Sequence, residues 1–137
     1  MALRYVECPR DAWQGWAHVI PTEVKAAYLQ SLLGAGFRAL DLASFVSPRA
    51  VPQLADSEAV LARLEVPEGA DLLGIVANER GLERALRVPQ LTSVGFPLSV
   101  NETFQRRNTG RSLADAWALV EALAAGSSAG GLRFVVY

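Results

Sequence analysis

Short apolar runs alternate with polar loops and helical patterns five times along the chain, and this alternation restricts the fold more than any other feature. Most of the runs are followed by a stretch with helical spacing of apolar residues. Parallel strands need crossover connections, which helices supply, so the pattern predicts an α/β domain with a parallel sheet. An open sheet and a closed barrel both satisfy it. The runs cover residues 4–8, 37–45, 71–77, 91–98 and 132–137.

Helical patterns fill most of the connections. The first predicted helix opens at residues 21–23, where Thr22 is placed to cap it. Asp56 or Ser57 is expected to cap the second helix, and Ser112 the last, which a flexible turn at residues 126–131 follows. The predicted buried stripe of the first helix is Val24, Tyr28, Leu29, Leu32 and Leu33, and that of the last is Leu113, Ala116, Trp117, Val120 and Leu123.

Composition limits the classes of partner. The 137 residues suffice for one domain with a hydrophobic core, and 51% are hydrophobic. Thirteen basic and 14 acidic residues balance without a block of like charge, which argues against nucleic acid or an anionic membrane as the main partner. The single cysteine excludes an internal disulfide, and neither a signal peptide nor a membrane-spanning run is recognisable. We therefore expect a cytoplasmic protein.

Polar residues gather where the predicted strands end. In parallel α/β folds, side chains at the carboxyl ends of the strands carry the chemistry. Carboxylate and amide oxygens with an arginine suit a divalent metal site that binds an anionic oxygen. The candidate residues in chain order are Arg10, Asp11, Gln14, Asp41, Ser44, Asn78 and Asn108.

Several of these residues also have a structural interpretation. Asp41 lies within an apolar run, where a buried carboxylate requires a partner, so both a functional role and a salt bridge with Arg10 explain it. Ser44 fits the start of a turn and Asn78 fits a helix cap. The pair Arg106-Arg107 is typical of a solvated face, although a substrate phosphate would also favour it.

Three segments resemble hydroxymethylglutaryl-CoA lyases. Residues 9–14 with 21–25 resemble the opening of these enzymes, residues 44–56 resemble the signature after their second strand, and residues 101–108 resemble the loop after their fourth. The similarity extends over essentially all 137 residues. It implies a single, incomplete TIM-barrel domain over residues 1–137 that holds strands one to five of eight.

The resemblance also implies a reaction and its residues. Members of the family cleave 3-hydroxy-3-methylglutaryl-CoA to acetyl-CoA and acetoacetate, with an acyl-CoA as substrate and a divalent metal, Mg²⁺ or Mn²⁺, as cofactor. By position, Asp11 matches the metal-ligating Asp and Arg10 the catalytic Arg that stabilises the enolate. Asp41 lies at the position where the family commonly has a Glu that supports the site, and on this resemblance it is assigned as catalytic. The expected substrate-binding residues are Gln14, Ser44, Asn78 and Asn108.

The chain departs from the family pattern in its site. Residues 12–13 are Ala-Trp where the family has Gly-Leu, and Asp41 is one methylene shorter than Glu. The family's His-x-His pair, an Asn and a catalytic Cys come from the second half of the barrel, whereas His18 and Cys8 of this chain lie in other settings. One carboxylate does not hold a divalent ion tightly, so turnover by this chain alone is not expected.

Two alternatives stay open. The first is a non-catalytic half-barrel that forms a homo-oligomer or pairs with a complementary C-terminal half, because the apolar run at residues 132–137 has no covering helix. The second is a related metal-dependent aldolase or acyl-CoA synthase that shares the Arg-Asp-x-x-Gln start. The Ser-Phe-Val-Ser-Pro stretch at residues 44–48 argues against the second alternative.

Overall fold

A sheet of four parallel strands forms the centre of the structure, a computed structural model that describes residues 3–137. The strands lie side by side in chain order, so the winding never reverses as it does in a doubly wound sheet. This order favours the barrel over the open sheet. The strands are β1 (Ala39–Ser44), β2 (Asp71–Ile75), β3 (Ser93–Phe96) and β4 (Arg133–Val136).

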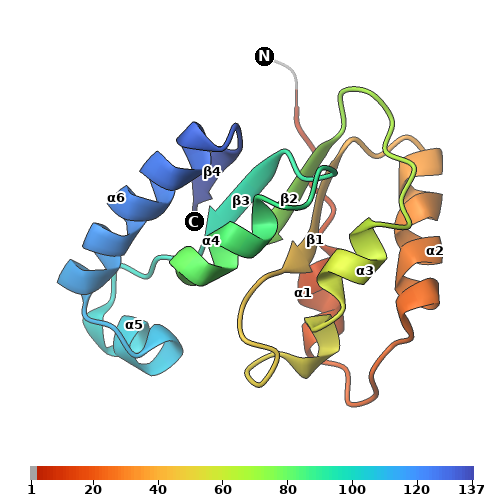
Figure 1. The fold of residues 1–137 in the computed structure, drawn as a ribbon. Coiled ribbons are helices and arrows are strands. Elements are labelled where there is room, and N and C mark those ends of the chain that lie inside the picture. Colours follow the sequence, from red (N-terminus) through yellow and green to blue (C-terminus); the bar gives the residue numbers. More distant parts are fainter. Residues whose placement is uncertain (1–2) are drawn as a thin grey trace.

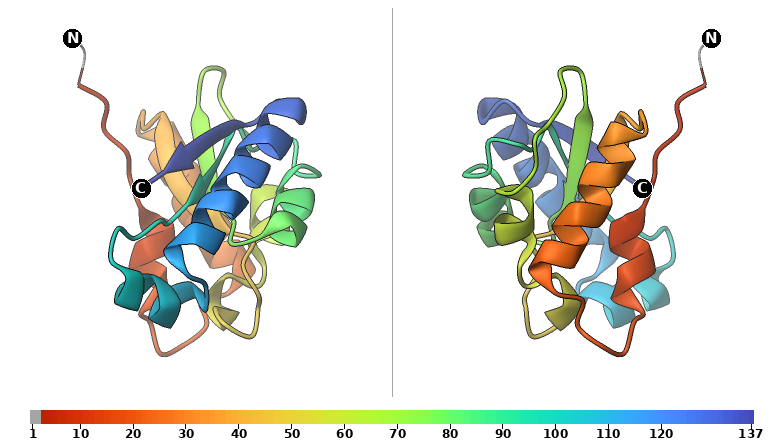
Figure 2. Two further views of the ribbon diagram at one scale, coloured as in Figure 1. Left: turned by 90° about the vertical axis from the view of Figure 1, so that its left-hand side faces the viewer. Right: turned by 90° about the vertical axis from the view of Figure 1, so that its right-hand side faces the viewer.

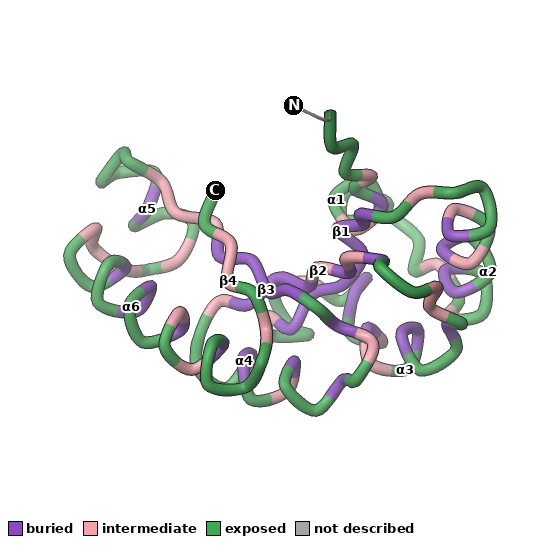
Figure 3. The backbone as a smooth tube through the Cα atoms, turned by 90° about the horizontal axis from the view of Figure 1, so that it is seen from above, coloured by how far each residue is buried: buried purple, intermediate pink, exposed green. Residues whose placement is uncertain are grey.

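Helices connect the strands and form an outer layer (Figures 1 and 2). Seen from above, the sheet is an arc with α2, α3, α4 and α6 along its convex side (Figure 3). No helix in residues 3–137 is long and apolar enough to cross a membrane. The helices are α1 (Pro9–Gln14), α2 (Thr22–Gly34), the 3₁₀ helix η1 (Pro52–Leu54), α3 (Ser57–Leu61), α4 (Glu79–Ala85), α5 (Glu102–Thr109) and α6 (Leu113–Ala129).

The hydrophobic core lies between the sheet and these outer helices. Leu40 of β1 and Leu72 of β2 are paired in register and fully buried. Leu29, Leu61 and Leu123 from α2, α3 and α6 are fully buried as well. Burial of each such side chain contributes about 1.5–3 kcal/mol, so the convex face of the sheet carries most of the packing.

The first apolar run does not form a full strand, contrary to the prediction of five. It is reduced to one parallel bridge, in which the Glu7 N–H donates to the Ala39 carbonyl (3.0 Å) and the Asp41 N–H to the Glu7 carbonyl (2.8 Å). Pro9, which has no N–H for a strand ladder, begins α1 two residues later. The run still lies beside β1, where the first strand of a barrel belongs.

Two predicted helix caps are wrong because their side chains bind elsewhere. Pro21 is the N-cap of α2, and the Thr22 hydroxyl donates to Asp56 Oδ2 (2.7 Å). Asp56 occupies the N-cap position of α3 as predicted, but its side chain makes no capping hydrogen bond, since Thr22 and Lys25 bind its carboxylate. The alternative, Ser57, is the first residue of α3, and its hydroxyl donates to the Leu54 carbonyl (2.8 Å). The Ser112 cap is confirmed, because its hydroxyl accepts the N–H of Asp115 (3.1 Å).

Helical spacing predicted burial at several positions that are exposed in the structure. Val24, Tyr28 and Trp117 are exposed, and the buried stripe of α2 is Lys25, Ala26, Leu29 and Leu33. Apolar residues occupy more than one face of each helix, so spacing alone does not select the face that packs.

Two segments without a predicted helix are helical. Residues 126–129 continue α6, where the Ser127 hydroxyl is satisfied by the Leu123 carbonyl (2.6 Å), and are not a flexible turn. Asn101 caps α5 in the segment after β3 by accepting the N–H of Phe104 (2.9 Å).

Candidate active site at the carboxyl ends of the strands

Arg10 and Asp41 form a two-point ion pair beside β1. The Arg10 Nε donates to Asp41 Oδ1 at 2.9 Å, and Nη2 donates to Oδ2 at 2.5 Å. The side chains are only 11% and 9% exposed. Two parallel bonds hold the planar guanidinium in one orientation. The structure thus brings the two predicted catalytic residues together.

The bridge at Glu7 positions this pair. Because the Asp41 N–H is bonded to the Glu7 carbonyl, the start of α1 is fixed close to Asp41, and Arg10 is the second residue of that helix. The register between β1 and β2 is irregular between Asp41 and Ala43. Such a bulge changes the direction of side chains, and all residues of β1 are buried.

The charges around the pair shift the pKa values of three groups. Burial alone would lower the pKa of Arg10, but the hydrogen bonds and charge of Asp41 outweigh it and raise that pKa. Burial, followed by the negative charge of Asp41, raises the pKa of Tyr137 to about 12. The same two causes raise the pKa of the Cys8 thiol, so the thiolate is disfavoured at this position.

Asp11 and Gln14 extend the site on the exposed side of α1. The remaining nitrogen of Arg10, Nη1, donates to Gln14 Oε1 at 3.1 Å and lies 3.4 Å from Asp11 Oδ1. The side chain of Asp11 is 75% exposed. One guanidinium therefore connects three of the predicted site residues.

The described residues do not complete a divalent-metal site. Across residues 3–137, no group of three or more His, Cys, Asp or Glu side chains is arranged to hold a metal ion. Asp11 is a single exposed carboxylate beside a cation, and both oxygens of Asp41 are bound to Arg10. Since divalent magnesium or manganese needs several oxygen ligands, these residues alone do not fit the cofactor.

The other predicted substrate-binding residues do not join the pair. Ser44 is buried at the end of β1, where its hydroxyl accepts the N–H of Val46 (3.4 Å) as at the start of a turn. Asn78 caps α4 by accepting the N–H of Gly81 (2.8 Å). Asn108 is exposed on α5. Within residues 3–137, none of these three side chains hydrogen-bonds to Arg10 or Asp41.

A hollow of about 330 Å³ opens on the concave face of the sheet beside Asp41. Tyr137 lines it, and its ring packs so closely on β3 that a Cβ added to Gly95 would lie 3.0 Å from the ring. The sequence pattern does not single out Tyr137 as a site residue, because its only signal is that it is the last residue of the fifth apolar run. The hollow is further lined by Val6, Cys8, Leu73 and Val135.

A buried polar network, which the sequence pattern does not reveal, supports the segment after β1. Lys25 is 1% exposed, and its Nζ donates to Asp56 Oδ1 (2.7 Å) and to the Gln53 carbonyl. The Gln53 side chain accepts the N–H of Ile20 (2.8 Å) and donates to the His18 carbonyl (2.9 Å). The network therefore joins α2 and the loop before it to the segment that resembles the lyase signature.

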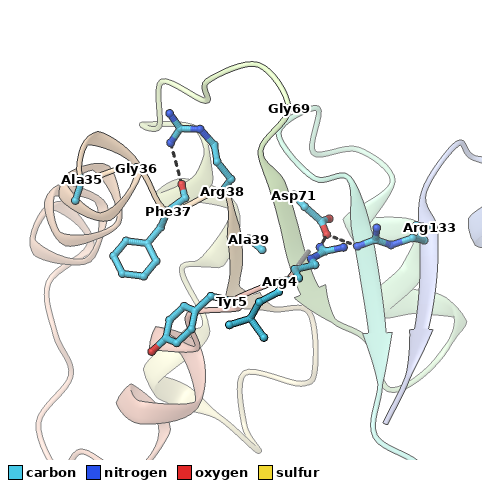
Figure 4. Close-up of a pocket in the computed structure, with 11 residues that line it drawn as sticks. Arg4, Tyr5, Ala35, Gly36, Phe37, Arg38, Ala39, Gly69, Asp71 and Arg133 are labelled. Atoms are coloured by element: carbon cyan, nitrogen blue, oxygen red, sulfur yellow. Dashed lines mark hydrogen bonds and ion pairs between the residues drawn. The ribbon is translucent and has the colours of Figure 1, made fainter. Parts of the chain in front are cut away.

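A second polar cluster lies at the opposite, amino ends of the strands (Figure 4). The Asp71 carboxylate at the start of β2 binds both Arg4 and Arg133 and also accepts a hydrogen bond from Thr92 (2.7 Å). Because these arginines share a carboxylate that joins the N-terminal segment, β2 and β4, we assign the cluster a structural role. This end of a barrel sheet normally serves stability.

Curated proteins similar to this chain are lyases. Mitochondrial hydroxymethylglutaryl-CoA lyase of Arabidopsis thaliana is 34% identical over 100 residues, which cover 73% of this chain and 21% of that protein. Hydroxymethylglutaryl-CoA lyase of Pseudomonas mevalonii is 32% identical over 105 residues, covering 77% and 35%. The chain thus spans between about a fifth and two fifths of the curated relatives that it matches. No family model matches it.

Solved structures similar to this chain are also hydroxymethylglutaryl-CoA lyases. Hydroxymethylglutaryl-CoA lyase from Pseudomonas aeruginosa matches with a TM-score of 0.92 at 29% identity, over 98% of this chain and 45% of that one. An HMG-CoA lyase from Acinetobacter baumannii, solved in complex with coenzyme A and 3-methylmalate, matches with a TM-score of 0.90 at 27% identity, over 98% and 44%. The match confirms the predicted parallel, barrel-type α/β architecture.

Proposed function

The chain corresponds in sequence and fold to the N-terminal portion of hydroxymethylglutaryl-CoA lyases, and on this premise we propose that it carries the arginine half of an acyl-CoA lyase site. The proposed reaction cleaves 3-hydroxy-3-methylglutaryl-CoA to acetyl-CoA and acetoacetate. The observation that carries the proposal is the buried, two-point Arg10–Asp41 pair at the carboxyl ends of the strands.

The geometry of the pair supports a role for Arg10 in stabilising negative charge. A base removes the proton of the tertiary hydroxyl, whose oxygen becomes the ketone carbonyl of acetoacetate as the carbon–carbon bond breaks. The electron pair of that bond passes to the carbon next to the thioester carbonyl and forms an enolate whose oxygen is negative. Nη1 of Arg10 has only exposed partners, Gln14 and Asp11, so its N–H groups can exchange these contacts for that oxygen while Asp41 holds the guanidinium in place. A charge fixed in place before the reaction stabilises such an oxyanion without reorganisation.

Asp41 has a different proposed role. Because both of its oxygens accept hydrogen bonds from Arg10, it orients the guanidinium and does not act as the base. Asp11 is proposed as one oxygen ligand of the divalent metal, and residues 3–137 supply no further group arranged with it. A cytoplasmic location remains a prediction, since the curated relatives include mitochondrial and cytoplasmic enzymes.

The test is an assay of acetoacetate formation from 3-hydroxy-3-methylglutaryl-CoA with magnesium or manganese, run together with a calorimetric titration of coenzyme A. Turnover that is lost in Arg10→Gln and retained in Arg63→Gln supports the proposal. Arg63 is a suitable control because it is an exposed arginine just after α3, whose side chain donates only to the Ala59 carbonyl (2.6 Å). If the wild-type chain turns over substrate and Arg10→Gln does so at the same rate, the proposed role of Arg10 is overturned.

Binding of coenzyme A without turnover would favour the alternative of a non-catalytic half-barrel. The observation on its side is the incomplete metal site in residues 3–137. The aldolase or acyl-CoA synthase alternative is not adopted, because the relatives named above are lyases.

A further inference from the structure

A hollow of about 660 Å³ lies at the amino ends of β1, β2 and β4, and we infer that it binds a small oxyanion of the phosphate type. It opens at the end of the sheet opposite to Arg10, so the inference does not depend on the proposed lyase function. We call it the amino-end hollow, and Figure 4 shows its lining. The charged residues of this lining are Arg4, Arg38, Asp71 and Arg133.

Two of the arginines converge on one carboxylate oxygen. Oδ2 of Asp71 is paired with Nη2 of both Arg4 and Arg133, so the two guanidiniums lie next to each other. Oδ1 of the same carboxylate accepts hydrogen bonds from the hydroxyls of Thr92 (2.7 Å) and Ser93. Both oxygens of Asp71 are therefore occupied, and its one negative charge is shared between two positive ones.

The shared carboxylate leaves positive charge and donors over. Within residues 3–137, neither Nε nor Nη1 of Arg4 and Arg133 donates a hydrogen bond, because the polar contacts of both side chains run through Nη2. The two side chains are 52% and 51% exposed, so these free N–H groups are accessible to a ligand. Like charges held this close repel each other, and a bound anion would offset the repulsion.

Arg38 adds a third positive charge to the hollow, directly before β1. Its Nη1 donates to the backbone carbonyls of Leu33 (2.9 Å) and Phe37 (3.0 Å), which holds the side chain at the end of α2. Among the described residues it has no acidic partner, so its charge is not neutralised. Three arginines and one aspartate give the lining a net charge of +2, whereas the whole chain carries −1.

The charge and the donors of the hollow match a phosphate group. A phosphate dianion balances a lining of +2, and its oxygens can accept parallel hydrogen bonds from more than one guanidinium. A carboxylate carries one charge and should bind less tightly. The phosphate can be free or part of an ester. An ester would also meet an aromatic wall, because the rings of Tyr5 and Phe37 line the hollow with their centres 5.8 Å apart.

Binding at this position should stabilise the N-terminal segment. Arg4 lies three residues before the bridge at Glu7, whereas Arg133 begins β4. An anion held by both arginines would add a second connection between these segments beside the one through Asp71. A ligand that binds only the folded chain raises the free energy of unfolding, so phosphate should raise the melting temperature.

The test titrates the full chain by calorimetry with three probes, inorganic phosphate, phenyl phosphate and acetate. It is run at constant ionic strength and at a pH of about 8, where phosphate is almost fully dianionic. Arg4→Gln and Arg133→Gln should each weaken phosphate binding by about five- to tenfold, as expected for a lost charged hydrogen bond at a half-exposed site. Arg87→Gln is the matched control, since this exposed arginine lies outside the hollow and makes the same change in charge.

Asp71→Asn distinguishes a ligand site from a cluster that is only structural. The substitution removes the one carboxylate that the two arginines share, so it should lower the melting temperature in buffer without phosphate. Because it also removes the anion that competes with the ligand, it should tighten phosphate binding by about five- to tenfold. Added phosphate should then restore part of the lost melting temperature.

The outcomes are independent of the lyase proposal. Weaker phosphate binding in Arg4→Gln and Arg133→Gln, tighter binding in Asp71→Asn and no change in Arg87→Gln support the site whether or not the chain cleaves an acyl-CoA. No phosphate binding by the wild type, or equal weakening in Arg87→Gln, overturns it. Acetate that binds as tightly as phosphate overturns the choice of phosphate. Within a supported site, tighter binding of phenyl phosphate assigns the hollow to phosphate esters, and equal affinity assigns it to free phosphate.

Discussion

Arg10 and Asp41 are separated by 31 residues in the sequence and are joined by two hydrogen bonds, of 2.9 and 2.5 Å, in the structure. The β-bridge at Glu7 supports this contact, because its two backbone hydrogen bonds hold the segment before α1 beside β1. The pair is therefore part of the packing of the N-terminal segment and also part of the candidate site. Substitutions should affect stability and binding together.

Asp41→Asn should destabilise the fold by about 2–4 kcal/mol, because it leaves the buried guanidinium of Arg10 without a counter-charge. Urea unfolding followed by circular dichroism measures this loss. Asp11→Asn is the control, since that side chain is 75% exposed and its distance from Arg10 is 3.4 Å. Equal stability of the two variants would contradict the prediction.

Lys25→Met should lower the free energy of unfolding by about 3 kcal/mol, because it leaves the Asp56 carboxylate and the Gln53 carbonyl without their buried donor. Thermal unfolding is the measurement. Gln30→Met is a suitable comparison on the same helix, since its side chain contacts the backbone of Glu65 at the surface. A melting temperature unchanged by Lys25→Met would show that the network is not a structural element.

Gly95→Ala should destabilise the sheet by about 1–3 kcal/mol, as overpacking does. Its Cβ would lie 3.0 Å from the Tyr137 ring, 3.1 Å from Ile75 and 3.2 Å from Leu73. Gly34→Ala tests the opposite case, because no atom lies within 4 Å of its added Cβ and the residue is helical. We expect Gly34→Ala to be neutral or stabilising in chemical denaturation.

The ionisation of Tyr137 should be visible in alkaline titration. Its pKa is raised to about 12 from an ordinary value of 10.0, so the unfolded chain loses this proton first. The corresponding stabilisation is complete below pH 10 and declines as the pH rises toward 12. Ultraviolet absorbance should show a late tyrosine step that Tyr137→Phe removes and Tyr28→Phe retains. Loss of the step in both variants would contradict the assignment.

The sequence predicted the strands β1 to β4 because they depend on local patterns, and it offered the Arg10–Asp41 contact as one of two explanations for the carboxylate in the second run. Apolar runs determine the strands, and a carboxylate inside such a run requires a cation. The cap at Asn78 followed from its position directly before a helix.

Features that depend on tertiary packing could not be predicted. The exposure of Tyr28 and Trp117 is determined by the helix face that meets the sheet, and apolar residues on several faces conceal that choice. Lys25, Gln53 and Asp56 come together only when α2 packs beside η1 and α3.

The burial of Lys25 has a practical consequence for chemical labelling. It is the only lysine among the 13 basic residues, and its amine is held inside the network with 1% exposure. Amine-directed dyes and cross-linkers should therefore find no accessible lysine in the folded chain. Modification of this side chain, followed by mass spectrometry, would report the fraction of molecules in which α2 has separated from α3.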